Sequence, residues 1–144
     1  MAMKSRSSKL VILLALFGCF LVAQDTPEQM LWKTLKRELA GPDGEVYFRE
    51  NVKDVLLPAL KGRADSWTVN EGVSKVVLRM MEGDAPEVTM MVHHLGHRMK
   101  RAPRAGEEIQ FSGVASSFTK DPLMLTLDVE RHEVRGIEFE KMPN

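Results

Sequence analysis

The sequence predicts a mainly β domain that follows one N-terminal helix. Three observations predict this fold class: an apolar stripe of helical period before residue 41, short β-like runs from about residue 60 onward, and turn residues that separate those runs. The spacing of the runs is typical of small barrels and sandwiches. The chain has 144 residues, 44% hydrophobic and 28% charged, which fits one globular domain.

Residues 1–23 have the pattern of a secretory signal peptide. Lys4, Arg6 and Lys9 precede an apolar run over residues 10–23, which has the length of a signal h-region and is too short to span a membrane. Ala23 supplies the small residue at the cleavage position. We therefore expect an exported protein, periplasmic or secreted, whose mature form has no transmembrane span.

Cys19 is the only cysteine, and it lies inside this signal. Cleavage after Ala23 removes it, which excludes disulfides, zinc–thiolate sites and cysteine nucleophiles from the mature domain. Residues 16–19 also loosely resemble a bacterial lipobox, so the alternative is a lipid anchor at Cys19.

The mature domain is mildly acidic. Three of the 20 basic residues lie in the signal and all 20 acidic residues follow it, so the remaining net charge is −3. Such a domain has no global attraction to nucleic acid. We expect no nucleic-acid partner.

Residues 24–44 are predicted to form an N-terminal amphipathic helix and a turn. Thr26 fits the N-cap, Pro27 the first helical position, and Gln29 the partner in a capping box. Gly41 and Pro42 mark the end of the helix. The apolar stripe that should pack on the domain consists of Leu31, Trp32, Leu35 and Leu39.

Residues 45–144 are predicted to form the β domain, beginning with a short helix within residues 45–53. Four strands are distinct and one is weaker, and turn residues make two pairs of them hairpins. The strands are residues 61–68 (the weaker one), 73–81, 87–94, 108–118 and 123–129. A last strand is expected near residues 134–139.

This order of one helix and five short strands resembles the small exported OB-fold-like domains found as uncharacterised bacterial proteins. The likeness is carried by Gly106 leading into IQFSGV at residues 109–114, and by FTKDPLMLT at residues 118–126. It covers roughly residues 45–139 and implies a small five-stranded OB-like barrel, with a small β-sandwich as the alternative. Because these motifs are packing and turn motifs, they imply a fold and no function.

A narrower resemblance links residues 86–90 to one strand of periplasmic copper-chaperone OB domains, which bind metal through methionines, a histidine and a tryptophan. Only Met90 stands at a ligand position, because Ala85 and Val88 replace two of the others. The ligand set of that family is therefore not expected here.

Three of the four histidines and three methionines fall within residues 90–99. Imidazole and thioether ligands suit copper, and imidazole also suits zinc. The candidate metal ligands are His93, His94, His97 and Met99. On a strand His93 and His94 face opposite sides, whereas His94 and His97 converge if the chain turns at Leu95–Gly96. The alternative is that the methionines fill the core and the histidines are solvated, so no cofactor is expected.

A basic loop follows this cluster, with no acidic residue between residues 88 and 106. Such a loop is a candidate for binding a phosphate or carboxylate, and a solvated loop is the alternative. The anion-binding candidates are Arg98, Lys100, Arg101 and Arg104.

Nothing in the sequence points to catalysis. Nucleophile-elbow, Walker, zincin and dinucleotide motifs are absent from it, and Ser116, Ser117 and His132 have no common frame. We therefore expect a non-catalytic binding or interaction module whose partner is an envelope protein or a small ligand. The alternative is a periplasmic metal-binding or anion-binding protein that uses the cluster at residues 93–97 and the basic loop.

Overall fold

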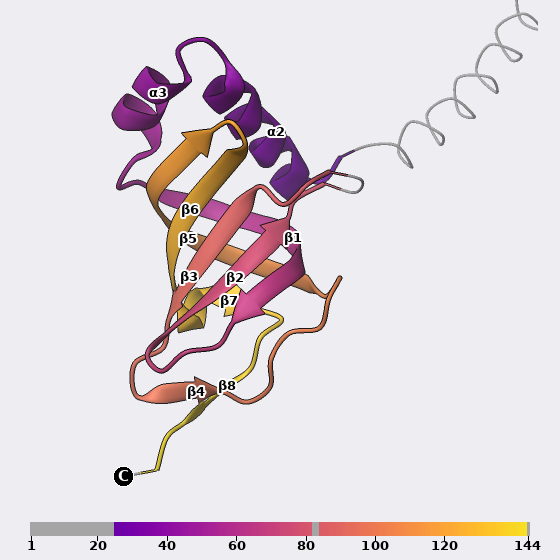
Figure 1. Ribbon diagram of the computed structural model, residues 1–144, viewed down its shortest axis with the longest axis vertical. Coiled ribbons are helices and arrows are strands. Elements are labelled where there is room, and N and C mark those ends of the chain that lie inside the picture. Colours follow the sequence, from indigo (N-terminus) through magenta and orange to yellow (C-terminus); the bar gives the residue numbers. More distant parts are fainter. Residues whose placement is uncertain (1–24, 82–83, 144) are drawn as a thin grey trace, which may run out of the picture.

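The computed structural model describes residues 25–81 and 84–143. The expected signal peptide, its cleavage after Ala23 and the lipid anchor at Cys19 fall outside these residues. The described chain is mainly β, and its α-helices come before the first strand (Figure 1). None of its helices is long and apolar enough to cross a membrane.

The N-terminal helix α2 (Pro27–Ala40) is confirmed with the predicted cap. The backbone N–H of Gln29 donates to Thr26 Oγ1 at 3.2 Å, and that of Thr26 donates to Gln29 Oε1 at 2.9 Å, so both N-terminal donors are satisfied. Trp32, Leu35 and Leu39 are buried. The predicted stripe therefore attaches α2 to the sheet.

A partly buried ion pair adds to this attachment. Lys36 Nζ lies 2.9 Å from Glu87 Oε2 and 3.3 Å from Asp84 Oδ2. Both acidic residues lie in the segment that connects the second strand to the third. The hydrogen bond to Glu87 raises the pKa of Lys36, against a smaller opposing effect of burial. The Glu87 carboxylate is thereby buried with a partner.

The short helix expected within residues 45–53 is present as α3 (Gly44–Tyr47) and a π-helical turn, η1 (Phe48–Val52). Gly44 permits it to follow α2 so closely, because a Cβ at this position would lie 2.0 Å from the Leu39 carbonyl oxygen. Phe48 and Val52 are buried. The ring centroid of Phe48 lies 4.8 Å from that of Phe118 in the sheet.

Five strands form a closed ring: β1 (Leu56–Thr68), β2 (Val73–Arg79), β3 (Val88–His93), β6 (Leu123–Glu130) and β5 (Glu108–Lys120). They are hydrogen-bonded in that order, and β5 pairs with β1 again. β3 and β6 are parallel, and the other neighbours in the ring are antiparallel. Both predicted hairpins, β2–β3 and β5–β6, are confirmed.

β1 is the strand whose start was predicted wrongly, since it begins at Leu56 and not near residue 61. Pro58 lacks a backbone donor and argues against a strand in sequence. In the structure the β1–β5 register shifts between Leu57 and Leu60, so an irregularity accommodates Pro58. The Ser112 hydroxyl, which donates to the Leu57 carbonyl, supports the same stretch.

The strand expected near residues 134–139 is corrected to two short strands in different sheets. β7 (Val134–Arg135) pairs with β5, and β8 (Phe139–Lys141) pairs with β4 (His97–Met99). Gly136, at a φ of 106°, redirects the chain between them. β4 lies in the stretch expected to be a loop. The β4–β8 sheet and the helices lie at opposite ends of the domain (Figure 1).

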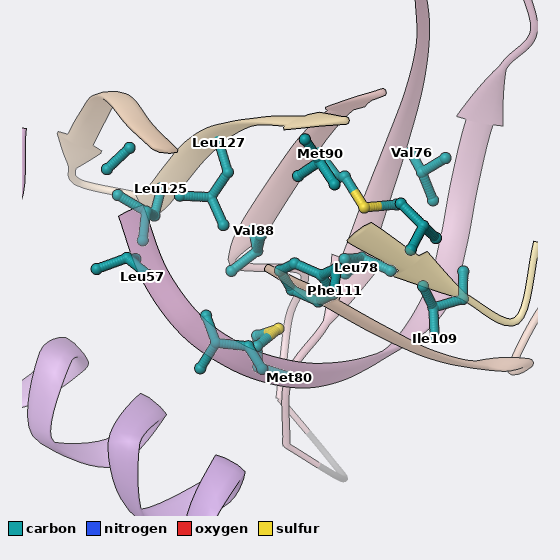
Figure 2. Close-up of a cluster of buried hydrophobic side chains, with 14 of the residues drawn as sticks. Leu57, Val76, Leu78, Met80, Val88, Met90, Ile109, Phe111, Leu125 and Leu127 are labelled. Atoms are coloured by element: carbon teal, nitrogen blue, oxygen red, sulfur yellow. The ribbon is translucent and has the colours of Figure 1, made fainter. Parts of the chain in front are cut away.

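The core fills the inside of the ring. Alternate residues point inward, as Figure 2 shows with Phe111 among side chains from the other strands. The predicted alternation in β6 is confirmed, because Leu125, Leu127 and Val129 are buried. The residues between them point to the outside of the ring.

Candidate functional site

The two adjacent histidines at the end of β3 point to opposite sides, as strand alternation predicts: His93 is the last residue of β3 and His94 follows it. His94 is 2% exposed. His93 points to the outer face, where its Nε2 lies 2.9 Å from Asp128 Oδ1 on β6. The two adjacent histidines therefore have different partners.

Both ring nitrogens of His94 are already engaged. Its Nδ1 lies 2.9 Å from the His97 carbonyl oxygen, and its Nε2 lies 2.8 Å from Ser74 Oγ. Since a carbonyl only accepts, Nδ1 carries a hydrogen. The Ser74 hydroxyl accepts from the Asn70 N–H, and its one hydrogen has two acceptors in reach, His94 Nε2 and the Asn70 carbonyl oxygen at 3.1 Å. The chain does turn at Leu95–Gly96, but it brings the backbone of His97 to His94 and not the imidazole.

Metal binding by this cluster would break at least one of these bonds. Met99 is also buried in the core. Across residues 25–81 and 84–143, no three His, Cys, Asp or Glu side chains are grouped to hold a metal ion. In this geometry the His94 side chain is a junction between the start of β2, the end of β3 and the start of β4.

The basic loop meets acidic residues that are distant in sequence. Arg98 Nε lies 2.7 Å from Glu140 Oε1, and Lys100 Nζ lies 3.8 Å from Glu138 Oε2. Arg101 forms two hydrogen bonds with Glu107, at 3.1 and 3.2 Å. Three of the four predicted anion-binding side chains therefore have a carboxylate partner. For Arg104 it is the backbone N–H that donates to Glu107, at 2.9 Å.

These contacts make the loop sensitive to acid. The hydrogen bond from Arg101, followed by that from the Arg104 backbone, lowers the pKa of Glu107. A lowered folded-state pKa contributes stability above the unfolded value of about 4.3, and this contribution is lost as pH falls through the folded value. Glu107→Gln should therefore destabilise the protein at about pH 7 and have little effect at about pH 2.

Urea unfolding of both proteins at the two pH values measures this dependence. Ala102→Trp, a change in the same exposed loop that keeps Glu107, serves as a control and should show no such pH dependence. A Glu107→Gln deficit that is equally large in acid would contradict the role of the Glu107 carboxylate.

The residues considered for catalysis do not share a site. Ser116 Oγ donates to the Thr126 carbonyl at 3.2 Å, and Ser117 is exposed. His132, in the short 3-10 helix η2 (Arg131–Glu133), has its Nε2 3.7 Å from Glu133 Oε1. Within the described chain no hydrogen bond joins either serine to His132.

A groove of about 700 Å³ opens beside β1, away from the histidine cluster. Four segments line it: Thr26 and Gln29 at the start of α2, residues 61–65 of β1, residues 79–81 at the end of β2, and residues 105, 106 and 108 at the start of β5. Strands supply most of the lining, so its side chains are held in place.

The charges in this groove were not singled out from the sequence. Lys61 and Arg63 alternate along β1, which places them on one face. Asp65 lies in the bulge between Ala64 and Ser66 and lines the same groove. Arg79 of β2 donates to Asp65 at 2.7 Å, and Lys61 Nζ lies 3.9 Å from Glu108 Oε1. The alternating charges K-x-R-x-D at residues 61–65 are visible in the sequence. Only the pairing of β1 with β2 and β5 shows which charged side chains lie next to them.

Comparison with known proteins assigns no relative. The chain matches no protein-family model, and no curated protein matches it either.

Proposed function

We propose that this protein is an exported, non-catalytic binding module that holds a small ligand in the groove beside β1. The groove carries the proposal. Its volume of about 700 Å³ falls within the roughly 300–1,000 Å³ of small-ligand sites. Its lining combines apolar surface from Met80 and Met81 with charged groups from β1 and β2, as such sites require.

We further propose that the ring is an OB-like barrel. The order β1-β2-β3-β6-β5, closed through β1 and β5 and parallel only between β3 and β6, supports this. The structure departs from the usual OB-fold in the position of its helix. An OB barrel usually has a helix between its third and fourth strands in chain order, here β3 and β5, whereas this helix precedes β1. OB-folds commonly bind ligands on their strands and loops, and this analogy supports a binding role without identifying a ligand.

Export rests on the charged and apolar pattern of residues 1–23. It implies that the ligand is met in the periplasm or outside the cell. The non-catalytic part of the proposal is supported by the separate contacts of Ser116, which donates to the Thr126 carbonyl, and of His132, which lies beside Glu133.

Filling the groove tests the proposal. Ala105 lines the groove and Ala102 lies in the same loop outside that lining, and both are exposed. We expect Ala105→Trp to block binding and Ala102→Trp to leave it intact. The measurement is ¹⁵N NMR of the purified protein with a fragment library of neutral, cationic and anionic compounds, read at the amides of Gly62, Ala64 and Gly106.

Fragments that shift these amides in the wild type and in Ala102→Trp, but not in Ala105→Trp, support the groove as the site. The proposal fails if no fragment of any charge shifts them, or if Ala105→Trp binds as the wild type does.

A further inference from the structure

Two arginines stand directly opposite each other across the β1–β2 ladder. Arg63 and Arg79 are register partners, and both are exposed and line the groove. Directly opposed residues of an antiparallel pair have Cβ atoms about 4.5–5.5 Å apart, so like charges there destabilise the pairing. The arrangement calls for a counter-charge.

The protein supplies only part of that counter-charge. Asp65 accepts from Arg79 Nη2 at 2.7 Å. Arg63 Nη1 donates to the Gly106 carbonyl at 3.0 Å, which carries no net charge. Glu108 faces Arg63 across the β1–β5 ladder, but its carboxylate contacts Lys61. Among the residues that the structure describes, no carboxylate lies within ion-pair distance of Arg63. The five charged groups that line the groove are Lys61, Arg63, Asp65, Arg79 and Glu108, which leaves one net positive charge.

We propose that Arg63 and Arg79 together bind the oxyanion of a small organic ligand, either a carboxylate or a phosphate. This inference rests on the proposed binding role of the groove. A guanidinium presents parallel N–H donors that match two oxygens of such a group. The bond to Gly106 holds the Arg63 side chain at the groove, so less side-chain freedom is lost on binding. The apolar part of the ligand would lie against Met80 and Met81.

Arg63 distinguishes this groove from most of the basic loop. Arg98, Lys100 and Arg101 have carboxylate partners, so an anion there would compete with an existing ion pair, as it would at Arg79 with Asp65. Within the described chain Arg63 has no ion pair, and it stands directly opposite a second arginine. We therefore place the proposed oxyanion at the opposed arginines, while anion binding by the basic loop stays a prediction.

The test is titration of the purified protein at low ionic strength with sodium phosphate in one arm and sodium succinate in the other, followed by ¹⁵N NMR. Sodium chloride at matched ionic strength controls for screening. We expect saturable shifts at the amides of Gly62, Ala64 and Gly106, and the stronger arm identifies the oxyanion. Arg63→Gln and Arg79→Gln should each weaken binding about tenfold or more.

Lys75→Gln is the matched control. Lys75 is also an exposed cation on β2, but it lies opposite Thr68 and outside the groove, so its loss should leave binding unchanged. Arg63→Gln removes a like-charge repulsion from Arg79 but also the hydrogen bond to Gly106, so its melting temperature without ligand should stay close to that of the wild type. If Arg63→Gln fails to fold, Arg63→Lys keeps the charge without the two-pronged donor and should still bind more weakly.

The inference is overturned if neither oxyanion shifts these amides beyond the chloride control, or if Arg63→Gln and Arg63→Lys bind as tightly as the wild type. It is also overturned if Lys75→Gln loses as much affinity. Neutral or cationic fragments that occupy the groove while oxyanions do not would overturn this inference alone, and an absence of all fragment binding would overturn the proposed function with it.

Discussion

Replacing Trp32 with alanine is expected to lower the free energy of unfolding by about 3–5 kcal/mol. Trp32 is 1% exposed and belongs to the stripe that attaches α2 to the ring. Truncation to alanine leaves a cavity between α2 and the ring. Because the sheet is closed on itself, its strands cannot move in to fill that cavity. Urea unfolding followed by circular dichroism measures the loss.

Trp32→Phe is the informative companion. Among the described residues the indole Nε1 has no hydrogen-bond partner, and a buried unpaired donor costs about 1–3 kcal/mol. Phenylalanine removes that donor, which offsets part of the lost volume, so we expect a change within about 1 kcal/mol. If phenylalanine costs as much as alanine, the indole N–H has a partner and this account of Trp32 is wrong.

Replacing His94 with alanine is expected to cost about 2–4 kcal/mol of stability. The change removes one of the partners of the Ser74 hydroxyl, which keeps its bonds to the Asn70 backbone, and the side-chain donor to the His97 carbonyl, at a place that is 2% exposed. It also removes a ring whose centroid lies 5.5 Å from that of Phe139 on β8. The β4–β8 sheet should loosen first, so its amides should exchange with solvent faster than those of the ring.

His93→Ala is the matched control, because His93 is the adjacent histidine on the outer face. Its contact with Asp128 joins two side chains that are 41% and 48% exposed, and such pairs contribute about 0–1 kcal/mol. Equal losses from the two variants would contradict the junction role of His94. The metal-binding alternative would instead be supported by two results together: zinc or copper raises the melting temperature of the wild type, and neither metal raises that of His93→Ala or His94→Ala.

Local patterns predicted the elements of this protein well. Thr26, Pro27 and Gln29 set the start of α2 because a cap depends on residues within one turn. The hairpins β2–β3 and β5–β6 were predictable because alternation and turn residues act over short spans. β1 was predicted too short. The missed stretch contains Pro58, which lacks a backbone donor, and the irregularity that accommodates it depends on pairing with β5.

The candidate site was predictable only in part. The basic loop was visible as a run of cations, but Glu138 and Glu140 lie about 40 residues further on and meet it only because β8 pairs with β4. His94 was a candidate ligand in the sequence, and the fold gave it Ser74 as a partner across the β2–β3 pair. Neither contact has a local signature, because each depends on the pairing of separate strands.

The sequence by itself therefore determined a mainly β domain, its capped N-terminal helix and its two hairpins, since these depend on neighbours in the chain. The tertiary structure decided the closure of the ring, the neutralisation of the basic loop, and the placement of Arg63 opposite Arg79. Those features depend on strand register, and a register joins residues that the sequence keeps apart. The two arginines proposed to bind a ligand lie next to each other only because β1 pairs with β2.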